Sequence, residues 1–202
     1  MTMAYFALSS GNLTQDWSNA GLITADDNWN NVPSIVGYLG DTNSGSPTNV
    51  DARTLTGAAL GVVDVIANQT STSINNGGVA EFAIANPTVA LQGSGTADAP
   101  SLVIHLDATG RQNVNVAFNA RDIDSLAEDA AQQINVQYRL GGSGDWINVP
   151  NGYFPDVTTV STATQVTPVS LLLPAAVNGQ AQVQVRIMTT NAAGNDEWVG
   201  ID

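Results

Sequence analysis

Strict alternation of apolar and polar residues is the sequence feature that most constrains how this chain folds. The three clearest alternating segments are Asn113–Asn119, Gln133–Leu140 and Gln182–Met188. Because successive side chains of a β-strand point to opposite faces, each segment is expected to bury one face and to present polar groups on the other. The apolar residues expected to face inward include Phe118, Ile134, Tyr138 and Ile187.

Weaker strand patterns occur along the rest of the chain. They are Tyr5–Leu8, Ser34–Leu39, Gly61–Ile66, Val79–Ile84, Thr88–Leu91, Ser101–Asp107, Asp145–Val149, Val166–Leu173 and Glu197–Ile201. Turn residues such as Asn75–Gly78, Gly93–Gly95 and Gly141–Gly144 separate them, and only Ser125–Gln133 has a helical pattern, of two turns at most. About a dozen short strands in 202 residues predict one all-β module, residues 1–202, folded as an antiparallel β-sandwich or jelly roll.

The charge balance disfavours nucleic acid as a partner and bears on where the protein is located. The chain has five basic residues, all arginine, against 18 acidic ones, so its net charge is −13. Nucleic-acid binding by a basic patch is therefore disfavoured. No apolar run reaches the roughly 18 residues of a membrane span, so membrane insertion is not expected. The acidic excess fits a secreted protein exposed to millimolar calcium, although acidity that merely keeps a protein soluble explains it equally well.

Three acidic clusters and one terminal aspartate are candidate calcium ligands. They are Asp26 with Asp27, Asp122 with Asp124, the segment Asn195, Asp196 and Glu197, and Asp202. Calcium takes six to eight oxygen ligands, which clustered carboxylates and loop carbonyls supply together. The residues after Asp122 and Asp124 do not follow the EF-hand pattern, so a site must be assembled from segments distant in sequence, with the C-terminal segment or Asp202 meeting Asp26 and Asp27 or Asp122 and Asp124. The alternative is that these residues only form turns and cap chain ends.

The polar residues of the alternating strands form a second candidate site. One row is Asn135, Gln137 and Arg139, a second is Gln182, Gln184 and Arg186, and a third is Asn113, Asn115, Asn119 and Arg121. If these strands are adjacent, amides and guanidiniums share one sheet face, which suits the hydroxyl groups of an extracellular glycan or cell-surface polymer. Trp146 is the candidate aromatic platform for stacking a sugar ring. A solvated sheet face is the alternative.

Catalytic chemistry has little support in the sequence. His105 is the only histidine, it lies within an alternating strand, and no Gly-x-Ser-x-Gly elbow accompanies it. A solvent-facing or hydrogen-bonded strand histidine explains it better. Paired carboxylates of a glycosidase type remain open, because the aspartates can supply them. A hydrolase domain is therefore the third interpretation, after an accessory module and a carbohydrate-binding module.

Several segments resemble a known bacterial module. They are Asn19–Thr24, Asp27–Trp29, Val32–Asp41 and Asn195–Asp202. The chain resembles the N-terminal β-sandwich module of secreted endonuclease/exonuclease/phosphatase-family proteins, and its ending is similar to the closing strand of jelly-roll adhesion modules, in which aspartates bind a metal. The resemblance implies a noncatalytic, calcium-stabilised accessory or adhesion module that supports or targets other domains of the same polypeptide. The catalytic part of those proteins is not in this sequence.

Overall fold

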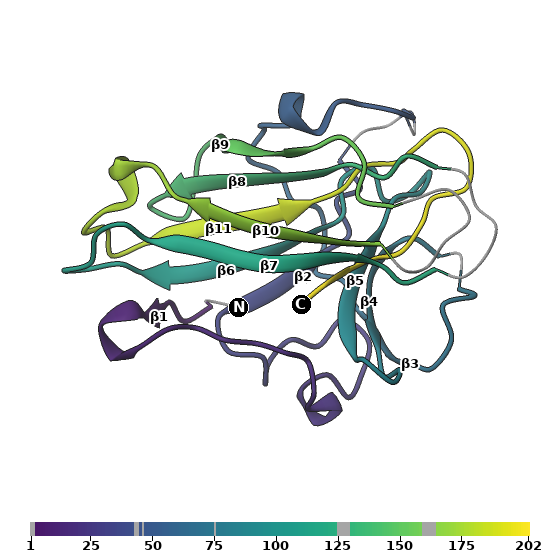
Figure 1. Ribbon diagram of the computed structural model, residues 1–202, viewed down its shortest axis with the longest axis horizontal. Helices are drawn as coiled ribbons and strands as arrows, with labels where there is room; N and C mark the ends of the chain where they lie inside the picture. The colour runs from purple at the N-terminus through teal and green to yellow at the C-terminus, as the bar shows by residue number, and fades with distance from the viewer. Residues whose placement is uncertain (1–2, 43–44, 46, 75, 125–129, 159–164) are drawn as a thin grey trace.

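The computed structural model describes residues 3–42, 45, 47–74, 76–124, 130–158 and 165–202. Within these ranges the protein is all-β, with twelve strands in two six-stranded sheets and short 3-10 turns as the helical elements (Figure 1). The fold class expected from the alternation is therefore confirmed.

The first sheet has the order β1-β6-β11-β8-β9, with β2 also paired to β6. Its strands are β1 (Phe6–Ala7), β2 (Ile35–Tyr38), β6 (Ser101–Asp107), β8 (Ile134–Leu140), β9 (Ile147–Phe154) and β11 (Val183–Met188). All its pairs are antiparallel except β1 with β6.

The second sheet has the order β10-β7-β12-β5-β4-β3. Its strands are β3 (Ile66–Gln69), β4 (Gly78–Phe82), β5 (Thr88–Gln92), β7 (Asn115–Asp122), β10 (Val166–Leu172) and β12 (Val199–Ile201). The 3-10 turns are η1 (Leu8–Ser10), η2 (Ala20–Leu22), η3 (Ala52–Thr54) and η4 (Ala175–Val177). The N-terminal segment runs along one side of the sandwich, beneath β6 and β7 in Figure 1.

The core lies between the sheets and contains the expected inward-facing residues. Phe118, Ile134, Tyr138 and Ile187 are all buried in it. A smaller cluster surrounds Trp198, whose ring meets Phe82 edge-on at 5.1 Å and whose indole N–H donates to the Ile74 carbonyl at 2.8 Å. Apolar side chains therefore also cover part of the outer face of the second sheet.

Three sequence expectations need correction or fall outside the described residues. The strand expected at Gly61–Ile66 instead begins at Ile66, and the β7 row of polar residues lies in the second sheet, not beside β8 and β11. Alternation fixes which side chains share a face of one strand, but not which sheet the strand joins. Residues 125–129 of the expected helix lie outside the described residues, and 130–133 form no helix.

Candidate functional site

The outer face of the first sheet carries a layer of buried polar side chains, here called the polar layer. Its members are Asn135, Gln137 and Arg139 of β8, Gln184 and Arg186 of β11, and Trp146. Sequence analysis named all six. The β8–β11 pairing brings the five polar residues together, and Trp146, which directly precedes β9, contacts them through the two arginines. Gln182 precedes β11 and is exposed, so it lies at the margin of this layer.

Two arginines organise the polar layer. Arg186 donates through Nε to Gln137 Oε1 at 2.8 Å, and Arg139 donates through Nε to Gln184 Oε1 at 2.6 Å. Both guanidiniums lie over the ring of Trp146, at 4.2 Å for Arg139 and 4.7 Å for Arg186, in cation–π geometry. Burial, with a further contribution from the charge of Arg139, lowers the pKa of Arg186 to about 9. The side-chain oxygens that accept hydrogen bonds from these two guanidiniums belong to the amides of Gln137 and Gln184, not to carboxylates.

The polar layer binds a segment of its own chain, residues 52–58. Asn135 Nδ2 donates to the Ala52 carbonyl at 3.3 Å, Arg186 Nη2 to the Leu55 carbonyl at 2.5 Å, and Arg139 Nη1 to the Ala58 carbonyl at 3.3 Å. The alternative of a solvated sheet face is therefore wrong for the rows of β8 and β11, because this segment covers them, whereas Asn113, Asn115 and Asn119 of the third row are exposed. Ligand binding by these residues stays a prediction.

His105 lies on the same outer face and is buried. Its ring meets Tyr5 edge-on at 5.2 Å, and its Nδ1 has no hydrogen-bond partner among the described residues. Burial lowers its pKa, so the ring is neutral at physiological pH. The expectation of a solvent-facing histidine is wrong, because the side chain is buried. The hydrogen-bonded alternative is not contradicted, because hydrogen bonds with the backbone of Ser34 and Val103 act against the fall in the pKa of His105.

The structure places the acidic clusters in different parts of the fold. Asp26 and Asp27 accept hydrogen bonds from the backbone N–H groups of Ala67 and Val65, at 2.9 Å and 3.3 Å. Asp202 forms an ion pair with Arg121. Asp122 lies opposite Val199 in the β7–β12 ladder, which places Asp122 and Asp124 near the segment of Glu197.

These positions do not establish a metal centre. In the part of the chain that the structure describes, no three His, Cys, Asp or Glu side chains come together in a way that could hold a metal ion. Asp26 and Asp27 contact residues 65–67 rather than the C-terminal segment. Calcium binding therefore stays a prediction.

Asp64 is a partly buried acidic residue with a strongly raised pKa. Burial, together with the negative charges of Asp27 and Asp26, raises its pKa to about 6 against an ordinary value of 3.8. A hydrogen bond of 2.6 Å from the Val79 N–H acts in the opposite direction. The carboxyl group is therefore partly protonated in mildly acidic solution.

We expect the free energy of unfolding to fall less between pH 4 and pH 7 in the Asp64→Asn variant than in the original protein. A raised folded-state pKa means that the folded protein holds a proton that the unfolded chain releases, so this stabilisation is complete below pH 3.8 and is lost towards pH 6. After discounting for partial exposure, the effect is on the order of 1 kcal/mol. Urea titrations of both proteins across this range measure it, and identical pH profiles would contradict it.

Asp107→Asn provides the control with the opposite sign. Hydrogen bonds from Thr109 lower the pKa of the exposed Asp107, so its contribution is present above its unfolded-state pKa and is lost as pH falls.

A second polar site lies between the β5–β6 connection and the segment before β12, and is here called the amide cavity. It has a volume of about 410 Å³. Its lining residues are Gln92, Gly93, Ser94, Gly95, Asn191, Gly194, Asn195 and Asp196. Three amides, one hydroxyl and one carboxyl group therefore face the same space, with glycines leaving the backbone accessible.

Hydrogen bonds hold the amide cavity in shape. Gln92 Nε2 donates to the Asp196 carbonyl at 2.8 Å, while Asp196 Oδ1 accepts from the Ala192 N–H at 2.7 Å and from Gln132 Nε2 at 3.3 Å. Burial raises the pKa of Asp196, although these two hydrogen bonds act against the rise. The cavity is thus a preorganised set of donors and acceptors in which burial disfavours a full negative charge.

Sequence analysis named Asn195 and Asp196 but missed Gln92, Ser94 and Asn191. The glycine-rich stretch Gly93–Gly95 predicted only a turn, and no local signal shows that it meets residues 191–196. That approach depends on β12 pairing with β5.

Comparisons with known proteins gave matches among solved structures alone. No protein-family model and no curated protein matches the sequence. Among solved structures, a carbohydrate-binding module specific for non-crystalline cellulose is 14% identical, with a TM-score of 0.45, covering 67% of this chain and 93% of that one. A module in complex with β-1,4-galactotriose is 11% identical, with a TM-score of 0.33, covering 58% and 67%. A third, from the β-sandwich superfamily of carbohydrate-binding modules, is 11% identical, with a TM-score of 0.36, covering 69% and 64%.

These likenesses concern the fold alone. None of these three structures links the chain to endonuclease/exonuclease/phosphatase proteins. Within the described ranges, no helix has the length and apolar character needed to cross a membrane.

Proposed function

We propose that this protein is a noncatalytic module that binds a neutral glycan through the amide cavity. The observation that carries the proposal is the lining of that cavity, in which amide, hydroxyl and carboxyl groups converge without a cation or a large apolar side chain. Amides both donate and accept hydrogen bonds, as sugar hydroxyls do. The volume of about 410 Å³ lies within the ordinary range of small-molecule sites.

The electrostatics of the cavity favour a neutral ligand over a metal ion. Ionised carboxylates are the strongest oxygen ligands of a hard cation, whereas Asp196 is the single carboxylate among the lining residues and burial raises its pKa. We also propose that calcium binds elsewhere, between acidic clusters, and stabilises the fold. A thermal melt in chelator and then in calcium tests this proposal. An unchanged midpoint, together with no heat of calcium binding by calorimetry, would show that the calcium proposal is wrong.

A noncatalytic role in a secreted protein completes the proposal. His105 is buried against Tyr5, which gives it no path to act as a general base on a bound ligand. The acidic excess is the feature that supports secretion, and other domains of the same polypeptide are the proposed partners besides the glycan.

A binding assay with soluble oligosaccharides tests the proposal. β-1,4-linked gluco- and galacto-oligosaccharides are suitable first probes, within a wider glycan array. We expect Asn195→Ala to weaken binding by about two- to tenfold, which corresponds to the loss of one hydrogen bond between neutral groups. Asn195 is exposed, so this change should leave the fold intact.

Gln182→Ala is the matched control, because Gln182 is also an exposed amide but lies at the margin of the polar layer. Its binding should equal that of the original protein. If Gln182→Ala weakens binding and Asn195→Ala does not, the glycan site belongs to the polar layer and the amide cavity is the wrong location. If no glycan in the array binds, the proposed function is wrong.

A further inference from the structure

Residues 47–58, here called the strap, connect the amide cavity with the polar layer. The turn η3 of the strap contacts both β8 and β9, and it lies at the top of the view in Figure 1. The segment before β12, which lines the cavity, forms the yellow loop to its right in the same view. One continuous segment therefore reaches both polar sites.

At the cavity end, Asn49 holds the cavity wall by two hydrogen bonds. Its backbone N–H donates to the Asn191 carbonyl at 2.8 Å, and its Oδ1 accepts from the Ala193 N–H at 2.9 Å. Asn191 lines the cavity, and Ala192 between these two residues donates its N–H to Asp196 Oδ1, which lines the cavity as well. The position of this wall therefore depends on the strap.

Gln133 ties the middle of the strap to the same wall. Its Nε2 donates to the Val50 carbonyl at 2.8 Å and to Thr190 Oγ1 at 2.6 Å, and its Oε1 accepts from the Ala52 N–H at 3.0 Å. Thr190 Oγ1 also lies 3.2 Å from the Val50 carbonyl, to which it donates. Because Thr190 directly precedes Asn191, these bonds extend the contact of the strap with the cavity wall.

At the other end, the polar layer holds the strap by its carbonyl groups. The bonds from Arg186 to Leu55 and from Arg139 to Ala58 described above belong to this end. The backbone N–H of Trp146, whose ring both arginines cover, donates to the Thr56 carbonyl at 2.7 Å. Bonds to residues 49, 50, 52, 55, 56 and 58 thus follow one another along the strap, so its two ends are mechanically linked.

The strap has the features of a segment that opens locally. Of its residues, all of which the structure describes, only Ala52 is buried, and Arg53, Thr54, Gly57 and Ala58 are exposed. Segments with few buried apolar contacts open at a lower free energy than the core strands beneath them. Hydrogen bonds, rather than apolar packing, therefore decide how often the strap is docked.

We propose that the strap regulates the amide cavity, such that docking of the strap on the two arginines and ligand binding in the cavity stabilise each other. This inference rests on the proposed function, because it concerns the ligand of that cavity. When the strap opens, residues 191–193 lose their bonds to Asn49, so the open form binds the ligand less tightly. By thermodynamic linkage, a ligand that favours the docked form makes strap opening rarer.

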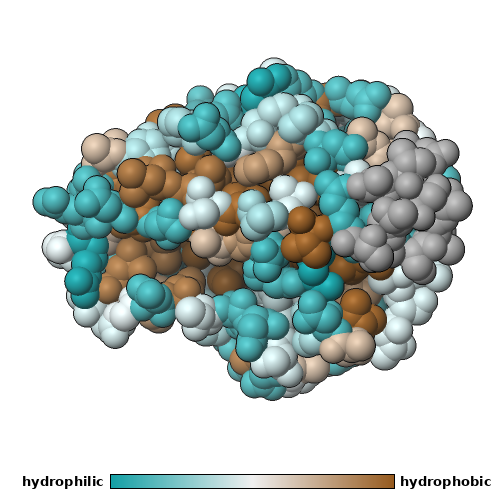
Figure 2. Space-filling model, in the orientation of Figure 1, coloured by the Kyte–Doolittle hydropathy of each residue, from teal (hydrophilic) through white to brown (hydrophobic). Residues whose placement is uncertain are grey.

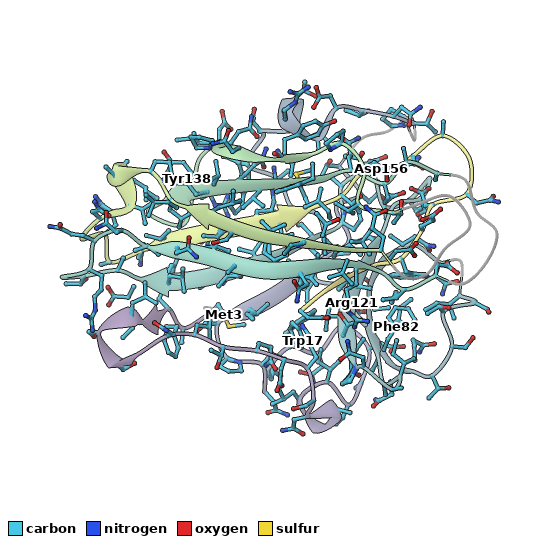
Figure 3. The ribbon with its side chains drawn as sticks, viewed as in Figure 1. Met3, Trp17, Phe82, Arg121, Tyr138 and Asp156 are labelled. Carbon is cyan, nitrogen blue, oxygen red and sulfur yellow. The ribbon has the colours of Figure 1, made fainter. Side chains whose placement is uncertain are left out.

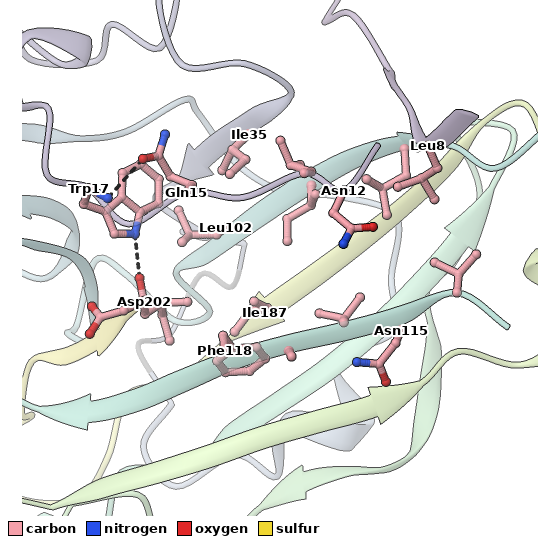
Figure 4. Close-up of a pocket in the computed structure, with 17 residues that line it drawn as sticks. Leu8, Asn12, Gln15, Trp17, Ile35, Leu102, Asn115, Phe118, Ile187 and Asp202 are labelled. Atoms are coloured by element: carbon pink, nitrogen blue, oxygen red, sulfur yellow. Dashed lines mark hydrogen bonds between the residues drawn. The ribbon is translucent and has the colours of Figure 1, made fainter. Parts of the chain in front are cut away.

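An apolar hollow on the other side of the sandwich provides an internal control. It has a volume of about 180 Å³, and its walls include Leu8, Trp17 and Phe118 (Figure 4). Figure 2 shows apolar surface in a hollow, and Figure 3 labels Trp17 below the sheets, whereas η3 lies above them in Figure 1. Among the described residues that line this hollow, none belongs to the strap. Amides beside it should therefore not respond to the strap.

Amide hydrogen exchange on the unmodified 202-residue chain tests the coupling. The reporters are the N–H groups of Asn49, Ala52 and Trp146, and the control is the Leu173 N–H, which donates to the Val114 carbonyl beside the hollow. If only the docked form binds, a β-1,4-linked gluco- or galacto-oligosaccharide at ten times its Kd slows exchange at the reporters about tenfold. The control should not change. A bound oligosaccharide that leaves the Trp146 amide unchanged would overturn the coupling and leave the proposed function intact.

Variants of Asn49 test the link itself. Asn49 has φ +56°, a conformation that glycine adopts readily, so Asn49→Gly removes the Oδ1 acceptor without straining the backbone. It should weaken oligosaccharide binding about three- to tenfold, as expected for one lost hydrogen bond. Asn49→Asp keeps an oxygen acceptor and should restore binding to within about twofold. Asn113→Gly is the matched control, since Asn113 is also an exposed asparagine, with φ +54°, and directly precedes Val114 of the hollow.

Exchange in the ligand-free variants gives a readout that does not depend on any glycan. Asn49→Gly should speed exchange of the Ala192 and Trp146 amides about three- to tenfold, although neither amide bonds to Asn49 directly. Asn113→Gly should leave both unchanged. Acceleration confined to Ala193, the direct partner of Asn49, would overturn the coupling. If no oligosaccharide binds, the proposed function is wrong, and this comparison still decides whether the strap and the cavity wall move together.

Discussion

Replacing Gly40 by alanine is expected to lower the free energy of unfolding by about 3 to 5 kcal/mol, which is at the upper end for single substitutions. Gly40 follows β2 with φ +70°, a left-handed conformation that disfavours side chains. A Cβ atom there would lie 2.0 Å from the Ala99 carbonyl oxygen and 2.2 Å from its carbon. Backbone atoms cannot rotate away as a side chain does. The segment after β2 and the segment before β6 must therefore move apart.

Gly110→Ala separates the steric effect from the effect of the backbone angle. Gly110 has φ +71°, nearly the same as Gly40, and a Cβ atom there would meet no atom within 4 Å. This control should cost only about 1 kcal/mol. Urea denaturation of both variants measures the difference. Equal losses of stability would show that the packing of Gly40 against Ala99 does not constrain the fold.

Replacing Ile187 by alanine is the second change with a large expected effect, a loss of about 2 to 5 kcal/mol. Ile187 lies in the central strand β11 and is 2% exposed within the core between the sheets. Truncation removes buried methyl and methylene groups, and the strands on either side of β11 prevent the space from closing. The cost therefore includes both transfer and cavity contributions.

Ile147→Ala is the matched control, since Ile147 is also a strand isoleucine but is 52% exposed. It should change the free energy of unfolding by less than about 1 kcal/mol. The midpoint and slope of a denaturant titration provide both values. A midpoint for Ile187→Ala close to that of the original protein would mean that the inward face of β11 is wrongly assigned.

The polar layer shows the difference between what the local sequence pattern predicts and what only the tertiary structure shows. Alternation correctly placed Gln137, Arg139 and Arg186 on the face opposite the core. It could not show that residues 52–58 cover that face, because nothing in the composition of this loop indicates that its carbonyl groups accept hydrogen bonds from arginines more than 80 residues away in the chain. Long-range contacts of this kind leave no periodic trace in the sequence.

The amide cavity depends even more strongly on topology. It exists because β12 pairs with β5 on one side and β7 on the other, which brings residues 191–196 beside the turn at 93–95. The sequence by itself determined the all-β class, most strands and the inward-facing residues, since these follow from the two-residue period of a strand. Only the tertiary structure decided which strands are neighbours and which polar face is covered, because strand order is set by packing across the whole core and not by any local pattern.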